Sequence, residues 1–105
     1  MSGVIDFYFD LISPFSYLAH TQLSGIATKH QRDIVYHVVD LAVIKLAGGN
    51  TGPTTRDMPQ KYKYSGSDMQ RWAARYGVTI TRPTGHIPGP GRLNKGVFLA
   101  QDRGV

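Results

Sequence analysis

An apolar strand that runs into a serine-proline helix start is the feature that most constrains the fold of this 105-residue chain. Residues 4–9 alternate between an apolar and a mixed face, which predicts a half-buried strand. Ser13 stands where a helix cap belongs, and Pro14 occupies the first helical position. Apolar residues at three- and four-residue spacing then predict a helix over 14–29.

A β-branched run at 34–39 follows this helix, so residues 4–39 read as strand, helix, strand. A connection of this length joins two parallel strands through a right-handed crossover. Two strands alone do not make a stable sheet, and only 78–81 offers a weak third candidate. We therefore expect an α/β fold whose sheet is incomplete in this chain. A second chain or further sequence would complete it.

Beyond the second strand the pattern turns helical. The sequence predicts short helices at 41–46 and 59–64, a helix from a capping box at 67–70 to Gly77, an irregular loop at 82–92, and a last helix at 93–102. Three aromatic residues are expected to pack into the core: Phe15, Tyr17 and Trp72.

Composition narrows the class of protein. The chain has 41% hydrophobic residues and 18% charged residues, which is typical of a soluble globular domain. It contains no cysteine, so it has no disulfide, thiolate metal site or thiol chemistry of its own, and we expect a cytoplasmic protein. The net charge of +5 comes from dispersed residues, which disfavours nucleic acid as a partner. No apolar run is long enough to predict a membrane span.

Ser13 is a candidate site for an anion. Its hydroxyl lies beside free N–H groups at the positive end of a helix dipole, and such positions lower the pKa of thiols. A protein without cysteine can use this arrangement to stabilise the thiolate of a bound cofactor. The N–H of Ser16 can contact the same anion. The alternative is that Ser13 is a plain helix cap and Ser16 an ordinary first-turn residue.

The chain also resembles a known enzyme family. The segments at 6–10 and 13–19 (Asp-Phe-Tyr-Phe-Asp and Ser-Pro-Phe-Ser-Tyr-Leu-Ala) resemble the opening of the 2-hydroxychromene-2-carboxylate isomerases. These enzymes are relatives of kappa-class glutathione transferases and thioredoxin-like disulfide oxidoreductases. The resemblance continues in order through most of the chain: Asp40-Leu41-Ala42, Lys45, Gly49-Asn50, Gly52-Pro53, Arg56-Asp57, Gln70-Arg71-Trp72-Ala73, Tyr76-Gly77, Pro83 and Asn94.

The resemblance implies a thioredoxin-like βαβ unit at residues 1–42 and part of an α-helical insertion domain at 43–105. It matches only the first half of such an enzyme. It also implies a glutathione-dependent isomerase of aromatic catabolism that interconverts 2-hydroxychromene-2-carboxylate and trans-o-hydroxybenzylidenepyruvate. In this family the serine at the position of Ser13 contacts the glutathione sulfur.

The family further implies a binding site for a small aromatic carboxylate substrate at four positions. Lys45 and Arg56 match the family's cationic residues. Thr55 stands where the family usually has asparagine, and His86 stands near a position where relatives carry tyrosine. A kappa-like glutathione transferase and a non-catalytic truncated fragment are the alternative functions. A homodimer is the expected assembly if a second chain completes the sheet.

Overall fold

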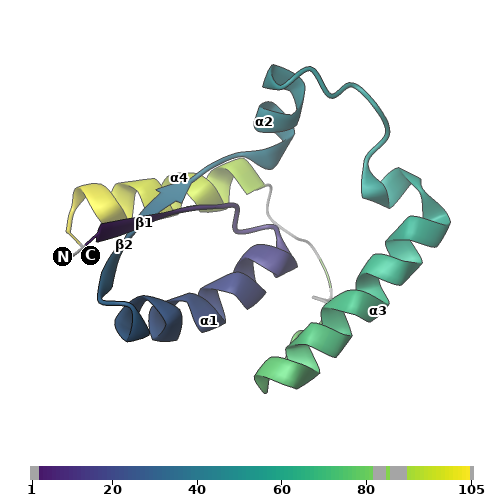
Figure 1. Ribbon diagram of the computed structural model, residues 1–105. Coiled ribbons are helices and arrows are strands. Elements are labelled where there is room, and N and C mark those ends of the chain that lie inside the picture. Colours follow the sequence, from purple (N-terminus) through teal and green to yellow (C-terminus); the bar gives the residue numbers. More distant parts are fainter. Residues whose placement is uncertain (1–2, 82–84, 86–89, 105) are drawn as a thin grey trace.

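The computed structural model describes residues 3–81, 85 and 90–104, and it begins with the expected parallel β-α-β unit (Figure 1). Strand β1 (Gly3–Phe9) pairs in parallel with β2 (Arg32–Val38), and helix α1 (Pro14–Lys29) connects them. Phe7 lies opposite Tyr36 in the register. The bounds of α1 are those that the sequence predicts, because the Ser13 cap and Pro14 define its start locally.

In the described part of the chain, four helical segments follow β2. They are α2 (Leu41–Ala47), the 3-10 turn η1 (Thr55–Asp57), α3 (Pro59–Tyr76) and α4 (Pro90–Asp102). The carboxylate of Asp40 caps α2 by accepting the N–H groups of Ala42 and Val43. The prediction of an α/β fold with a βαβ unit is confirmed.

The prediction of two separate helices within 59–76 is wrong, because α3 is continuous through Gly66. The hydroxyl of Ser67 donates back to the carbonyl of Lys63 at 3.4 Å instead of capping a new helix. The helix ends at Gly77, as predicted, where the backbone adopts the left-handed conformation with φ of 69°.

Residues 78–81, a weak candidate for a third strand, form none, so the described part of the chain holds a two-stranded sheet. One boundary in the second half differs from its prediction. Helix α4 begins at Pro90, three residues before the predicted start, because proline fits the first turn of a helix. Residues 90–92, predicted as the end of an irregular loop, are therefore helical, and residues 82–84 and 86–89 of that predicted loop lie outside the described residues.

The apolar core is small. Among the described residues the buried apolar side chains are Leu18, Ala27 and Ala73. Trp72, Phe15 and Tyr17, predicted as core, are 41%, 41% and 49% exposed. Trp72 lies instead on the surface of α3, with its ring 5.5 Å from that of Tyr76. These side chains are largely exposed because few elements cover either face of the two-stranded sheet.

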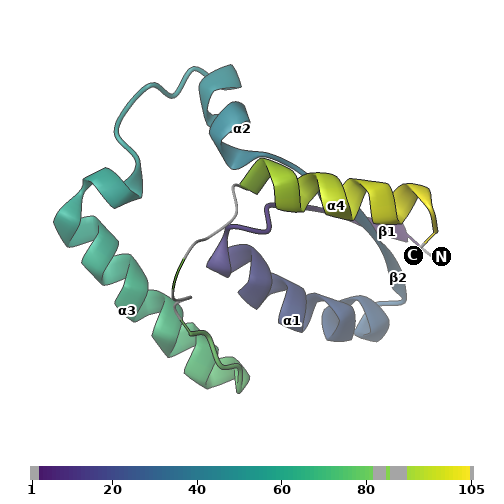
Figure 2. The ribbon, with the colours of Figure 1, turned by 180° about the vertical axis from the view of Figure 1, so that it is seen from behind.

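Helices α1 and α4 lie on different sides of the strand pair, whereas α2 and α3 project away from it (Figures 1 and 2). Helix α1 contacts both β2 and α3, and α4 contacts β2. The amide of Gln101 in α4 donates to the carbonyl of Tyr36 at 3.0 Å. Within the described ranges, no helix combines the length and apolar character needed to span a bilayer.

Candidate functional site

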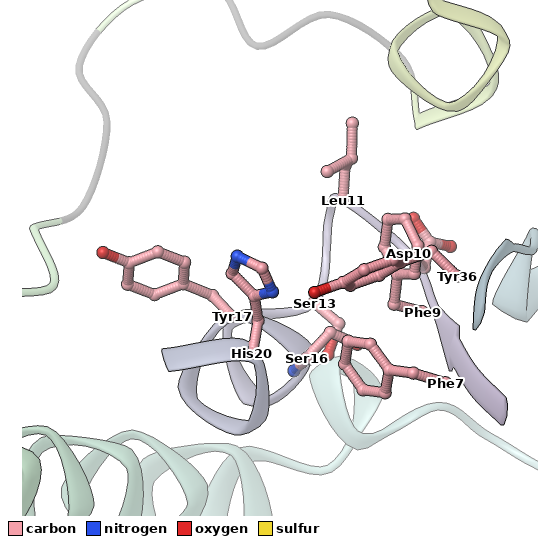
Figure 3. Close-up of a pocket in the computed structure, with 9 residues that line it drawn as sticks. All are labelled: Phe7, Phe9, Asp10, Leu11, Ser13, Ser16, Tyr17, His20 and Tyr36. Atoms are coloured by element: carbon pink, nitrogen blue, oxygen red, sulfur yellow. Dashed lines mark hydrogen bonds between the residues drawn. The ribbon is translucent and has the colours of Figure 1, made fainter. Parts of the chain in front are cut away.

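A pocket of about 190 Å³ opens beside the N-terminus of α1 (Figure 3). Aromatic rings from both strands form one wall. Phe7 and Phe9 stack with ring centroids 5.6 Å apart, and Tyr36 meets each of them edge to face at 6.0 and 6.1 Å. This wall is mostly hydrocarbon, and Leu11 and the carboxylate-bearing Asp10 also line the pocket.

A row of four side chains on one face of α1 forms the opposite wall. These are Ser13, Ser16, Tyr17 and His20, at spacings of three, four and seven residues from the first. The imidazole of His20 lies edge-on to Tyr36, with centroids 5.8 Å apart. The helix face thus presents two hydroxyl groups, a phenol and an imidazole to an otherwise aromatic cavity.

The Ser13 hydroxyl is placed by the helix that it caps. Its oxygen accepts the N–H of Ser16 at 3.2 Å, and its carbonyl accepts the N–H of Tyr17. In the part of the chain that the structure describes, no protein group accepts the hydroxyl proton of Ser13. That proton can therefore be donated to a ligand in the pocket. The Ser16 N–H, which the sequence analysis considered for the ligand, is engaged by Ser13 itself.

The turn that presents Ser13 is held by a buried carboxylate. Asp10 is 1% exposed, and it accepts the N–H of Ile12 and the N–H of Leu41, each at 3.0 Å. The amide of Asn94 donates to the same carboxylate at 3.1 Å. Burial raises the pKa of Asp10, but these three hydrogen bonds outweigh burial, and the pKa lies below its ordinary value. Asp10 is therefore a charged anchor at neutral pH.

The predicted substrate residues lie on other elements. Lys45 is on α2, and its ammonium donates to the carbonyl of Gly52. Thr55 and Arg56 are on η1, where Thr55 is half-buried and Arg56 exposed. None of these three lines the pocket beside Ser13. The fourth residue, His86, lies outside the described residues.

Lys45 and Arg56 both act electrostatically on the carboxylate of Asp57. The side-chain hydroxyl and the N–H of Thr54 donate to the Asp57 carboxylate at 2.8 and 3.1 Å. These bonds lower the pKa of Asp57, and the charges of Lys45 and Arg56 lower it further. Lys45 and Arg56 thus both act on the Asp57 carboxylate, and neither of them lines the Ser13 pocket.

Several pocket residues escaped the sequence analysis. His20 was not among the predicted site residues, although its position seven residues after Ser13 places it on the same helix face. No sequence pattern indicated Tyr36 as a pocket residue, because its position in the pocket depends on the register of β2 against β1. Within 3–81, 85 and 90–104, no three His, Cys, Asp or Glu side chains gather as metal ligands would.

Comparisons with known proteins agree with this architecture. Residues 4–105 match the family of DSBA-like thioredoxin domains. A 2-hydroxychromene-2-carboxylate isomerase of Pseudomonas putida is 43% identical over 97 residues, covering 92% of this chain and 47% of that enzyme. The enzyme of that name from Sphingobium xenophagum is 46% identical over 83 residues, covering 79% and 43%.

A solved structure of 2-hydroxychromene-2-carboxylate isomerase superposes with a TM-score of 0.80 at 43% identity. The superposition covers 91% of this chain and 46% of that one. The chain thus spans about half the length of the curated relatives it matches. The resemblance seen in the sequence and the thioredoxin-like fold that it implied are both confirmed.

Proposed function

The chain belongs to the family of DSBA-like thioredoxin domains, and from that premise we propose that it acts as a glutathione-dependent isomerase of 2-hydroxychromene-2-carboxylate. The product is trans-o-hydroxybenzylidenepyruvate. Relatives that carry the isomerase name are 42–46% identical to it, which supports this reaction over others of the same fold. Because fold alone does not determine function, the proposal depends on the chemistry of the Ser13 pocket.

The donors beside Ser13 fit a thiolate. The hydroxyl proton has no protein acceptor among the described residues. The positive end of the helix dipole stabilises a nearby anion by about 0.3–1 kcal/mol. A hydrogen bond from this hydroxyl to a charged sulfur contributes about 1.5–3 kcal/mol more. The chain has no cysteine that would compete for the position. A volume of about 190 Å³ admits the thiol end of a tripeptide, while its remaining parts extend beyond the opening.

Glutathione, when bound, supplies a thiolate that adds reversibly to a conjugated double bond, so that rotation becomes possible before the thiolate leaves. The contribution of Ser13 is to stabilise the ionised thiol by donating a hydrogen bond to the sulfur, while the proton stays on the serine oxygen. The aromatic wall of Phe7, Phe9 and Tyr36 limits the access of water to this contact. The low polarity of the wall strengthens the hydrogen bond that Ser13 makes.

Lys45 and Arg56 supply the positive charge for the substrate carboxylate. A guanidinium binds a carboxylate through two parallel hydrogen bonds, and an ammonium binds it as a point charge. Thr55 keeps a hydroxyl where relatives have an amide, so it can donate one hydrogen bond. His86 is proposed as a further contact on the strength of the family resemblance.

One observation carries the proposal: the Ser13 hydroxyl faces a pocket, with its proton available for donation. The test is chromene turnover by the chain with and without glutathione, compared between the native protein and Ser13→Ala. We expect turnover to require glutathione and to fall about ten- to a hundredfold in the variant, because a charge-assisted hydrogen bond is lost.

Ser16→Ala is the matched control, since it removes a neighbouring hydroxyl from the same pocket and leaves the Ser13 cap bond to the Ser16 N–H in place. Equal rates for the native protein and Ser13→Ala would refute the role of Ser13. Conjugation of a general electrophile without chromene turnover would identify a kappa-like transferase instead. A folded chain that neither binds glutathione nor turns over the chromene would favour a non-catalytic fragment.

A further inference from the structure

Asn94 is the most buried polar residue on α4, at 8% exposure, yet no part of the proposed chemistry uses it. All of its amide atoms are engaged with segments far away in the sequence. Its oxygen accepts the N–H of Leu11 at 3.1 Å. Its nitrogen donates to the Asp10 carboxylate and to the Val39 carbonyl, each at 3.1 Å.

Asp10 extends this set of contacts to the turn of Ser13 and to the helix of Lys45, where the proposed function needs side chains. Its backbone carbonyl accepts the N–H of Ser13 at 3.0 Å, which closes the turn in front of α1. Its second carboxylate oxygen accepts the N–H of Leu41, the first residue of α2. Helix α2 is the element that carries Lys45.

We propose that Asn94 is a positioning residue: together with Asp10 it forms a buried joint that sets the turn of Ser13 relative to the helix of Lys45. This inference rests on the proposed function for its catalytic consequence. The geometry favours a joint because Asp10 and Asn94 are only 1% and 8% exposed, and three hydrogen bonds from protein groups already engage the Asp10 carboxylate. A buried carboxylate held by three donors strongly prefers one arrangement of those donors.

The joint matters for catalysis because the reacting groups must be held at fixed distances from one another. Ser13 and Lys45 do not line a common pocket, so their relative placement depends on the backbone between them. Asp10 contacts the start of both helices, and Asn94 fixes Asp10 from the far end of the chain. A small displacement of reacting groups costs a large part of the rate advantage that comes from orientation.

The first test is amide hydrogen exchange in Asn94→Ala, followed by NMR. The informative amides are those of Ser13 and Leu41, because both bond to Asp10 and neither bonds to Asn94. We expect both to exchange roughly tenfold faster than in the native chain, as the loss of a supporting hydrogen bond predicts. Unchanged exchange at both amides would overturn the joint.

Gln101→Ala is the matched control. It removes an amide on the same helix that donates to a strand carbonyl, that of Tyr36, at 3.0 Å. It therefore removes a contact between α4 and the sheet without touching the joint, and we expect native exchange at Ser13 and Leu41. If Asn94→Ala does not fold, Asp10→Asn is measured in the same way, because it keeps the side-chain volume and removes the carboxylate.

The second test is chromene turnover at saturating glutathione. We expect kcat to fall at least roughly tenfold in Asn94→Ala, while the Gln101→Ala rate stays native, since the reacting groups are present but displaced. If the Ser13 and Leu41 amides exchange faster in Asn94→Ala but kcat stays native, the joint exists and does not control the reaction. If the native chain shows no turnover, the proposed function fails, and the exchange measurement still decides the joint by itself.

Discussion

At the scale of single residues, Ser13 combines a structural and a chemical task in one hydroxyl group. Its oxygen accepts the Ser16 N–H and so completes the helix start, while the same side chain lines a pocket. A cap bond is worth about 1 kcal/mol. Ser13→Ala therefore weakens α1 as well as removing a donor, so its activity must be compared at equal folded fraction.

Asp10 makes stability depend on pH in a defined direction. Its folded pKa lies below its ordinary value, because three hydrogen bonds to the carboxylate outweigh the effect of burial. The stabilisation is thus fully present above the unfolded pKa of about 3.9, and it is lost as pH falls through the lower folded pKa. At pH 7 we expect Asp10→Asn to lower the free energy of unfolding by about 1–3 kcal/mol.

Urea unfolding of both proteins at a series of pH values measures this dependence. The difference between the native chain and Asp10→Asn should be constant from neutral pH to about pH 5 and should shrink below about pH 4. Asp33→Asn, which alters an exposed carboxylate on β2, serves as the control. A difference that stays the same through pH 3 would contradict the assignment of Asp10 as a charged anchor.

At the scale of elements, the continuity of α3 is decided by packing and not by local signals. Residues 65–67 contain two serines and a glycine, which are weak helix formers, but the helix continues through them to the buried Ala73, and α3 packs against α1. Most helix stability in proteins comes from such tertiary contacts. The capping box at 67–70 therefore did not start a new helix.

Gly66 and Gly77 give a matched test of α3. A methyl group at Gly66 would have no atom within 4 Å, so Gly66→Ala should stabilise the chain by about 0.5–1 kcal/mol through higher helix propensity. Gly77 has φ of +69°, so Gly77→Ala should destabilise it by about 1 kcal/mol. Thermal melts followed by circular dichroism measure both. A loss of stability in Gly66→Ala would mean that α3 is interrupted there.

At the scale of the whole molecule, the chain exposes far more surface than a compact domain. Its accessible area is 8281 Å², whereas a folded monomer of this mass exposes about 5,800 Å². Its radius of gyration is 15.6 Å, compared with about 13 Å for a compact domain of this length. Much of the excess is apolar, including Val4 and Tyr8 on the outer face of β1 at 58% and 62% exposure.

We expect this open surface to be covered by a second copy in solution, as the proposed homodimer requires. The apparent Tm should then rise with protein concentration, because association stabilises the folded chain by mass action. Val4→Lys, which places a charge on the outer sheet face, should lower the association constant measured by sedimentation. Gly25→Ala, on a helix, is the control. A monodisperse monomer with a concentration-independent Tm would contradict the prediction.

The sequence by itself determined the order strand, helix, strand and the Ser13 cap, because strand alternation, helix periodicity and the cap each depend on residues close together in the sequence. Alternation predicted β1, and the Ser-Pro pair defined the start of α1 to the residue. The same local patterns failed for α3, whose continuity depends on packing against other elements.

Only the tertiary structure decided what surrounds Ser13. Tyr36 reaches the pocket through the register of two strands, and Asn94 bonds to Asp10 across 84 positions of sequence. The physical reason is that hydrogen bonds and ring contacts between distant segments form only after the chain has folded. Local sequence propensity does not indicate which distant partner each of these groups will contact.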